Sequence, residues 1–188
     1  MLTSHQTHVT CSPATSLPLT WQQQLQQAIR DPAELCQQLG LPDALVPAAR
    51  EAGQDFPLFA PRPFVSRIEH GNPADPLLRQ LLPISEELSI TPGFTADPLS
   101  EQGTHSVPGL LQKYHGRALL ITTGACAIHC RYCFRREYPY HESPAAARLW
   151  QPAIDQLAAD PQIEEVIFSG GDPLTLVDSQ LSELVERL

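Results

Sequence analysis

The chain has 188 residues, which is enough for one domain of ordinary size with a substantial core. Its formal net charge of −9 argues against a nucleic-acid-binding scaffold, because phosphate binding requires a basic face. No apolar run approaches the roughly 20 residues of a bilayer-spanning helix, and the polar start lacks the pattern of a secretory signal. These features predict a cytoplasmic protein with reduced thiols and with neither nucleic-acid nor membrane partners.

The first part of the chain is rich in proline and in short helix signals. Residues 1–19 are expected to form a flexible tail, and residues 20–112 a helical and irregular segment that wraps a core built elsewhere. Start and stop signals predict two short helices, marked by Thr20, Gln23, Asp31, Pro32 and Gly40. A weaker helix pattern covers 41–52. Farther on, turn signals alternate with short apolar groups, which is typical of connecting segments.

The second part alternates strand and helix patterns. The string "RALLITTGA" (117–125) predicts a strand buried on both faces, and "EEVIFSGGDP" (164–173) predicts a second strand that ends in glycines. A helix is expected to begin at Ser143, between the two strands. Another is expected after them, capped by Asp178 or Ser179.

This order of elements predicts an α/β fold with parallel strands and helices outside them. Two strands do not make a stable parallel sheet, so we expect residues 113–188 to be the first βα units of a partial (β/α) barrel. The chain is therefore expected to be the N-terminal part of a longer protein.

Three of the five cysteines fall within the eight residues "CAIHCRYC", namely Cys126, Cys130 and Cys133. A structural zinc site needs four ligands, and His129 or His141 would have to supply the fourth. A thioredoxin-type dithiol would use two of the cysteines and leave Cys126 unexplained. Ferredoxins supply four cysteines to each cubane, at other spacings.

Three thiolates without a fourth suit a [4Fe–4S] cluster in which one iron stays open to a ligand. The amino and carboxylate groups of S-adenosylmethionine can chelate that iron. Electron transfer from the reduced cluster then splits the sulfonium, and the resulting radical can abstract hydrogen from unactivated carbon. The zinc reading and a non-catalytic electron-transfer module remain open as alternatives.

Two motifs resemble the radical S-adenosylmethionine superfamily. The first is C-x3-C-x-aromatic-C, in which Tyr132 fills the aromatic position. The second is the glycine-rich turn "SGGDP" after the second strand, with Ser169, Gly170, Gly171 and Asp172. The resemblance implies that Tyr132 lies near the adenine and that the turn binds the methionine amino group of the cofactor.

Longer strings narrow the resemblance. "CRYCFRR" and "FSGGDPL" look like the lysine 2,3-aminomutase family, and "GNPADPLLRQ", "TPGFTADPL" and "VPGLLQKYHGRALLIT" resemble its branch that makes β-lysine for elongation factor P. The resemblance implies an isomerase that uses a [4Fe–4S] cluster, S-adenosylmethionine and pyridoxal phosphate to convert L-lysine to β-lysine. It also implies an external one-electron reductant and a functional link to elongation factor P and its lysyl ligase.

The resemblance assigns basic residues as well. Lys113 and Arg117 are implied for the phosphate of pyridoxal phosphate, and Arg135 for the substrate carboxylate. These residues belong to the segment from Lys113 to Glu137, which carries five basic residues and one acid within an acidic chain. Lys113 is the only lysine, and the family's Schiff-base lysine is expected beyond Leu188. A radical enzyme with another amino-acid substrate remains an alternative.

Overall fold

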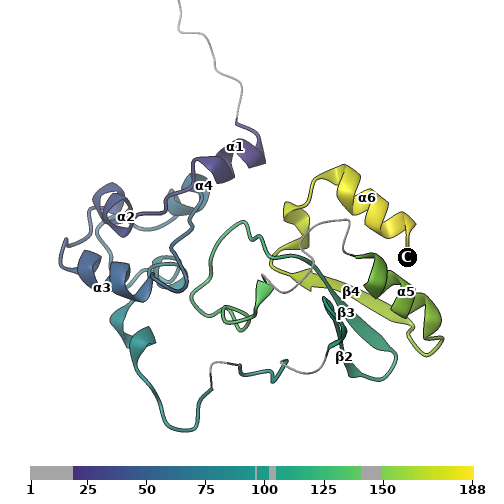
Figure 1. Cartoon of the computed structure of the whole chain (residues 1–188). Helices are drawn as coiled ribbons and strands as arrows, with labels where there is room; N and C mark the ends of the chain where they lie inside the picture. The colour runs from purple at the N-terminus through teal and green to yellow at the C-terminus, as the bar shows by residue number, and fades with distance from the viewer. Residues whose placement is uncertain (1–18, 96, 102–104, 141–149) are drawn as a thin grey trace, which may run out of the picture.

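The computed structural model describes residues 19–95, 97–101, 105–140 and 150–188. A half made of short helices is followed by a half built on a β-sheet (Figure 1). The first half contains α1 (Trp21–Gln26), α2 (Pro32–Leu39), α3 (Leu45–Ala52), α4 (Arg62–Val65), η1 (Leu78–Gln80) and η2 (Ser85–Leu88). The second half contains β1 (His105–Val107), β2 (Leu110–Tyr114), β3 (Arg117–Thr123), α5 (Gln151–Ala159), β4 (Glu165–Gly170), η5 (Pro173–Thr175) and α6 (Asp178–Glu186).

The helix signals of the first half are confirmed. The Thr20 hydroxyl accepts from the backbone N–H of Gln23, whose side chain accepts from the N–H of Thr20 in return, so the capping box forms. Asp31 caps α2 by accepting from the N–H of Ala33 at 3.0 Å. Gly40 ends that helix in the left-handed region, with φ of 63°.

The helical half has a hydrophobic core of its own. Its buried side chains come from α2, α3, α4, η1 and the segments between the elements: Ile29, Leu35, Cys36, Leu39, Leu41, Ala49, Leu58, Ala60, Val65, Ile68, Leu78, Leu81 and Leu82. The expectation that this region only wraps a core built elsewhere is therefore wrong. Each of these four helices contributes one to three apolar side chains, and only their assembly with the connecting segments forms the core.

In the described part of the chain, the strands form one sheet in the order β1-β2-β3-β4. The predicted parallel pairing of the second-half strands is confirmed, with Leu119 opposite Ile167 in β3 and β4. β3 is buried along most of its length, as its apolar run predicts. β1 and β2 add an antiparallel hairpin that was not predicted, so the sheet begins at His105, ahead of the expected boundary at residue 113.

Helices α5 and α6 cover the sheet (Figure 1). Trp150, Leu157 and Leu184 pack with Leu110 and Leu120 in a second core. The expected helix start at Ser143 lies outside the described residues. α6 begins at Asp178, but its N-cap is Val177, which makes no side-chain cap, so the capping role expected for Asp178 or Ser179 is wrong.

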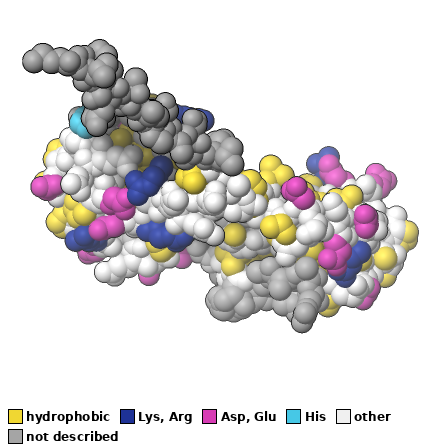
Figure 2. All heavy atoms as spheres, turned by 90° about the horizontal axis from the view of Figure 1, so that it is seen from above, with side chains coloured by type: hydrophobic (Ala, Val, Ile, Leu, Met, Phe, Trp, Pro, Cys, Tyr) yellow, Lys and Arg dark blue, Asp and Glu magenta, His cyan; other side chains and the backbone are white. Residues whose placement is uncertain are grey.

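None of the helices in the described ranges combines the length and the hydropathy that a bilayer crossing requires. Basic and acidic side chains are interspersed on the face of the molecule drawn in Figure 2. Ion pairs on the surface include Arg50 with Asp31 and Arg187 with Glu183.

The parallel pairing places the two motifs at one edge of the sheet. Thr123 ends β3 and leads into the cysteine loop, defined as residues 124–137. Gly170 ends β4 and lies within the glycine turn, defined as residues 169–173. The carboxyl ends of parallel strands are where ligands bind in α/β folds. The cysteine loop lies between the sheet and the helical half (Figure 1).

Candidate metal centre

The three cysteines of the loop are partly exposed and form no disulfide. The N–H of Cys133 donates to the carbonyl of Cys130 at 3.0 Å, so the second and third thiols are linked by a tight turn. Cys36, in contrast, is fully buried among the apolar side chains of the helical half, as its position beside Leu35 and Leu39 predicts.

The three thiols do not converge on a single point. Among the described residues, no three His, Cys, Asp or Glu side chains are placed to hold one metal ion. A mononuclear zinc site would require such convergence, whereas the thiolates of a [4Fe–4S] cube bind different irons and stand farther apart. The chemistry of the donors, three thiols in one C-x3-C-x2-C loop, fits a cubane that keeps one iron open to an exchangeable ligand.

His129, one of the two candidates for a fourth zinc ligand, is used in another way. Its backbone N–H donates to the carbonyl of Phe59, and its Nδ1 lies 2.9 Å from the carbonyl oxygen of Pro57. Its ring stacks on Phe56 with the centroids 4.8 Å apart. Burial lowers the pKa of His129, which keeps the ring neutral at physiological pH. The other candidate, His141, lies outside the described residues.

Cys126 is the thiol most affected by its surroundings. Burial, reinforced by Cys133, Asp172 and Cys130, raises its pKa to about 11. The metal-free loop therefore holds this sulfur as a protonated thiol at neutral pH. Because metals bind the thiolate, loading the site must release that proton.

The glycine turn packs directly against the start of the cysteine loop. The N–H of Gly171 donates to the carbonyl of Thr123, and the N–H of Asp172 donates to the carbonyl of Ala125, both at 2.7 Å. A Cβ on Gly171 would lie 2.1 Å from the Ala125 oxygen and 3.0 Å from the Cys126 sulfur. Only glycine permits this approach, which explains the second glycine of the motif.

The first glycine of the motif meets two requirements. Gly170 has φ of 115°, and a Cβ there would lie 2.2 Å from the Thr123 oxygen. Its carbonyl accepts a hydrogen bond from the Tyr140 hydroxyl at 2.8 Å. Asp172 accepts from the N–H of Leu174 at 3.0 Å and thereby caps η5. Its side chain thereby orients the turn.

Arg135 connects the cysteine loop to the glycine turn. Its guanidinium binds Glu101 in a bidentate pair, with Nε 2.9 Å from Oε2 and Nη2 2.8 Å from Oε1, and its Nη1 donates to the Ser169 hydroxyl at 2.6 Å. Both charged side chains are 7% exposed. Arg135 and Ser169, predicted separately as substrate and cofactor residues, are thus brought together, and Glu101 is a residue that sequence reasoning missed.

Lys113 and Arg117 lie apart from the cysteines. Arg117 begins β3, and the loop follows the other end of this seven-residue strand, about 20 Å away at about 3.3 Å per residue. Arg117 pairs with Glu165 at 2.6 Å, and the Lys113 ammonium donates to the carbonyl of Leu99. A phosphate beside Arg117 would also face the carboxylates of Glu164 and Glu165, which line the same hollow.

Tyr132 stands on the outer side of the loop. Its ring is 69% exposed, and its hydroxyl lies 3.5 Å from Oε1 of Gln80. The charge of Cys130 raises the pKa of the Tyr132 phenol, so the phenol stays neutral. The aromatic face is thus accessible to a planar ligand beside the thiols.

Comparison with known proteins agrees with this site. Residues 115–188 match the family model of a 4Fe-4S single cluster domain. The chain is 50% identical over 170 residues to the L-lysine 2,3-aminomutase of Escherichia coli (strain K12), covering 89% of this chain and 49% of that relative. It is 45% identical over 168 residues to the enzyme of the same name from Haemophilus influenzae, covering 89% and 50%. The Bacillus subtilis (strain 168) L-lysine 2,3-aminomutase is 30% identical over 169 residues, covering 89% and 36%. The chain thus spans half or less of the length of these curated relatives.

Proposed function

Because the chain is a homologue of the L-lysine 2,3-aminomutases over 89% of its length, we propose that the complete protein is a radical S-adenosylmethionine isomerase that converts L-lysine to β-lysine. One observation carries the proposal. A C-x3-C-x2-C loop with three thiols follows the carboxyl end of β3, and its first thiol, Cys126, lies against the glycine turn at the carboxyl end of β4.

The three cysteines would hold the [4Fe–4S] cluster. Cys126 is fixed beside Gly171 by the paired ends of β3 and β4, and Cys130 and Cys133 are fixed to each other by their turn. With three protein thiolates, one iron is left for an exchangeable ligand. When bound, the cluster supplies the electron that cleaves S-adenosylmethionine, while the residues of this chain bind, orient and shield the reactants.

The glycine turn and Tyr132 would position S-adenosylmethionine. Ser169, Gly170, Gly171 and Asp172 follow β4 directly beside the first cysteine, where backbone groups approach a ligand closely. The exposed face of Tyr132 provides a surface on which an adenine can stack.

Arg135 would bind the substrate carboxylate. Glu101 occupies its Nε and Nη2 edge and Ser169 binds its Nη1, so the substrate carboxylate would be bound by the remaining N–H groups of Nη1 and Nη2. The phosphate role of Lys113 and Arg117 rests on the family resemblance, as does the Schiff-base lysine expected beyond Leu188. Pyridoxal phosphate would hold the migrating nitrogen of the substrate.

We further propose that the β-lysine is used to modify elongation factor P through its lysyl ligase. The strings shared with that branch of the family support this assignment, and they lie largely in the segment from residue 71 to residue 123. A cytoplasmic location suits the proposal, because thiols stay reduced there and a one-electron reductant is at hand.

The test begins with the full-length protein, purified without oxygen and reconstituted with iron and sulfide. Mössbauer spectroscopy should show a cubane with one distinct iron that responds to S-adenosylmethionine. Zinc, or a cubane with four protein ligands, would refute the cluster assignment. Replacing Cys126, Cys130 or Cys133 by alanine should abolish the cluster, and Cys36→Ala is the control, because Cys36 lies in the core of the helical half.

Turnover tests the substrate. With L-lysine, pyridoxal phosphate and a reductant, β-lysine should accumulate without stoichiometric release of 5′-deoxyadenosine, because an isomerase regenerates its S-adenosylmethionine. One 5′-deoxyadenosine per product would refute the aminomutase assignment. Adding elongation factor P and its lysyl ligase should then give a mass increase on elongation factor P that depends on the β-lysine formed.

A further inference from the structure

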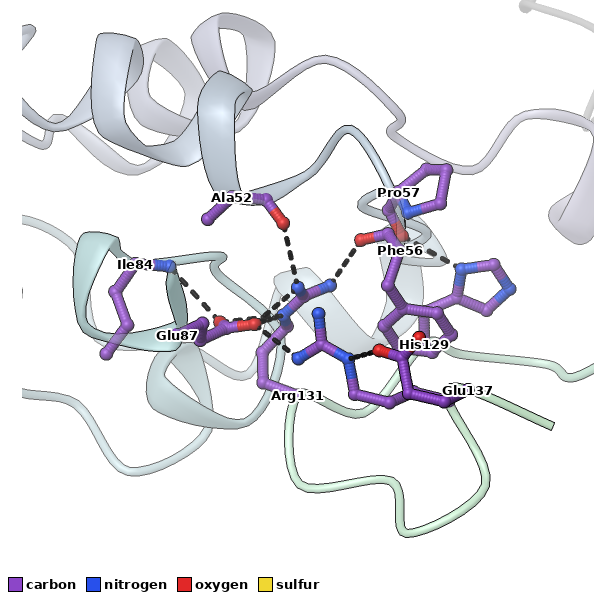
Figure 3. A network of polar contacts seen from close by, with 9 residues as sticks. Ala52, Phe56, Pro57, Ile84, Glu87, His129, Arg131 and Glu137 are labelled. Carbon is purple, nitrogen blue, oxygen red and sulfur yellow. Dashed lines mark hydrogen bonds and ion pairs between the residues drawn. The ribbon is translucent and has the colours of Figure 1, made fainter. Parts of the chain in front are cut away.

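The central part of the cysteine loop is bound to the helical half through Arg131, the residue that follows Cys130. Its Nη1 donates to the carbonyl of Phe56 at 2.6 Å, and its Nη2 lies 3.4 Å from that of Ala52. Its backbone N–H donates to the carbonyl of Gln80 at 2.8 Å. The side chain is 6% exposed. Figure 3 shows it reaching into the helical half among these groups. The main partner of Arg131 lies 44 residues earlier in the sequence.

That partner is Glu87, on η2. Its Oε2 lies 2.6 Å from Nη2 of Arg131, and its Oε1 lies 3.0 Å from Nε of the same guanidinium. Its Oε1 also accepts from the backbone N–H of Ile84 at 3.2 Å, which fixes the carboxylate on its own helix. The Glu87 side chain is 12% exposed. The carboxylate is therefore held by a backbone group of the helical half as well as by the loop.

A second arginine of the loop meets the same carboxylate. Nη1 of Arg136, three residues after Cys133, lies 2.6 Å from Oε2 of Glu87. Both guanidiniums also lie over the ring of Phe56, with their carbons 5.0 and 5.3 Å from its centroid. Glu87 thus binds both cations that flank the third cysteine, through one shared oxygen. Without its charge the two guanidiniums would lie close together over one aromatic ring.

We infer that Glu87 is a positioning residue of the metal centre, which sets the place of Cys130 and Cys133 by holding the two arginines that flank Cys133. The helical half is then a part of the site that determines where two of the three thiols stand. Removing one partner from a buried ion pair leaves a charge without compensation, and here Arg131 would lose Glu87, while Arg136 would keep only the exposed Glu137, whose Oε1 lies 3.3 Å from its Nε. The loop would move to relieve them, and the thiols would move with it. Residues behind metal ligands matter in this way because they orient the ligands.

The first measurement uses the metal-free full-length protein and compares Glu87→Gln with Glu86→Gln. Glu86 lies on the same short helix and is exposed, and its side chain bonds Ser85, so the control removes the same charge without touching the arginines. Hydrogen exchange is followed by mass spectrometry in the cysteine loop and in α5. We expect at least about a tenfold faster exchange in residues 126–136 of Glu87→Gln, with α5 unchanged and the control like the parent. Equal exchange in the loop, or faster exchange spread evenly over the chain, would overturn the inference.

The second measurement uses the reconstituted protein and a ferrous chelator. Loss of iron should be about tenfold faster or more in Glu87→Gln than in Glu86→Gln, the range found when groups behind metal ligands are removed. Equal rates would also overturn the inference. This part rests on the proposed cluster, but the exchange of the metal-free protein does not. If the parent protein binds no cluster, the proposed function is refuted. The exchange measurement on the metal-free protein still tests whether Glu87 holds the loop.

If Glu87→Gln unfolds as a whole, Glu87→Asp takes its place in both measurements. Aspartate keeps the charge but is one carbon shorter, so it cannot reach Arg131 and Arg136 together from the same backbone position. The same local loosening is expected at smaller size, and its absence contradicts the positioning role.

Discussion

Replacing Glu101 by glutamine should destabilise the protein strongly, because it breaks a buried bidentate ion pair. Glu101 and Arg135 are each 7% exposed and share two hydrogen bonds of 2.8 and 2.9 Å. Removing one partner of a buried pair costs about 3–5 kcal/mol, against a total stability of about 5–15 kcal/mol for a typical domain. Urea unfolding of the metal-free protein at pH 7, followed by circular dichroism, measures this loss directly. The midpoint should fall with an unchanged slope.

A double-mutant cycle separates this pair from other effects of the substitution. Arg135→Met removes the other charge, and the protein carrying both Glu101→Gln and Arg135→Met should be less destabilised than the sum of the single variants. We expect a coupling of about 1–3 kcal/mol, as found for residues in direct contact. A coupling near zero, together with a single-variant cost below about 1 kcal/mol, the range of exposed pairs, would refute the reasoning.

Three further predictions concern the loop and its anchors. Gly171→Ala should abolish iron binding, because its Cβ would lie 2.1 Å from the Ala125 oxygen. Gly93→Ala adds backbone strain at φ of 85° but meets nothing within 4 Å, so it should bind iron normally, and equal iron content in the two would contradict this. Alkylation of Cys126 by iodoacetamide in the metal-free protein should accelerate about tenfold per pH unit up to its pKa of about 11, and a rate that levels off at about pH 8.5, the ordinary value of a thiol, would contradict the raised pKa. Burial opposes the ionisation of Glu87, but hydrogen bonds from its two arginines outweigh it and lower its pKa, so its stabilisation should be complete above about pH 5 and be lost as the pH falls through the lowered value. Unfolding of the parent and Glu87→Gln from pH 6 to pH 3 should show their difference shrinking, and a constant difference would count against the ion pair.

Local signals in the sequence predicted local structure well. Thr20, Gln23, Asp31 and Gly40 act through backbone groups within four residues, so their roles can be read without the rest of the fold. The long apolar run at 117–123 also predicted the buried strand β3. The cap of α6 was predicted wrongly because an acidic or hydroxyl residue at a helix start can stand at the first helical position as well as at the cap.

The hairpin of β1 and β2 could have been found. Gly109 has φ of 82° in the two-residue turn between Val107 and Leu110, which pair across it, and Pro108-Gly109 is a turn signal that can be read in the sequence. β1 has only three residues, which is too few for a visible alternation of apolar and polar side chains.

The site was predictable in its ligands and not in its supports. The spacing of the three cysteines identified them, and the position of the glycine turn after a second parallel strand followed from the order of elements. Glu87 and Glu101 lie 44 and 34 residues before the arginines that they bind, and both resemble surface acids in the sequence. Their burial is a property of the folded chain, which brings the helical half against the loop.

The two hydrogen bonds that join Gly171 to Thr123 and Asp172 to Ala125 have a practical consequence for protein engineering. They join the cysteine loop and the glycine turn into a single structural unit at the carboxyl ends of β3 and β4. A peptide with the sequence of the loop alone would carry all three sulfurs but would lack the glycine turn that packs beside the first one. Transplanting the centre into another scaffold therefore requires two neighbouring parallel strands as the minimum graft, with both of their exits taken together.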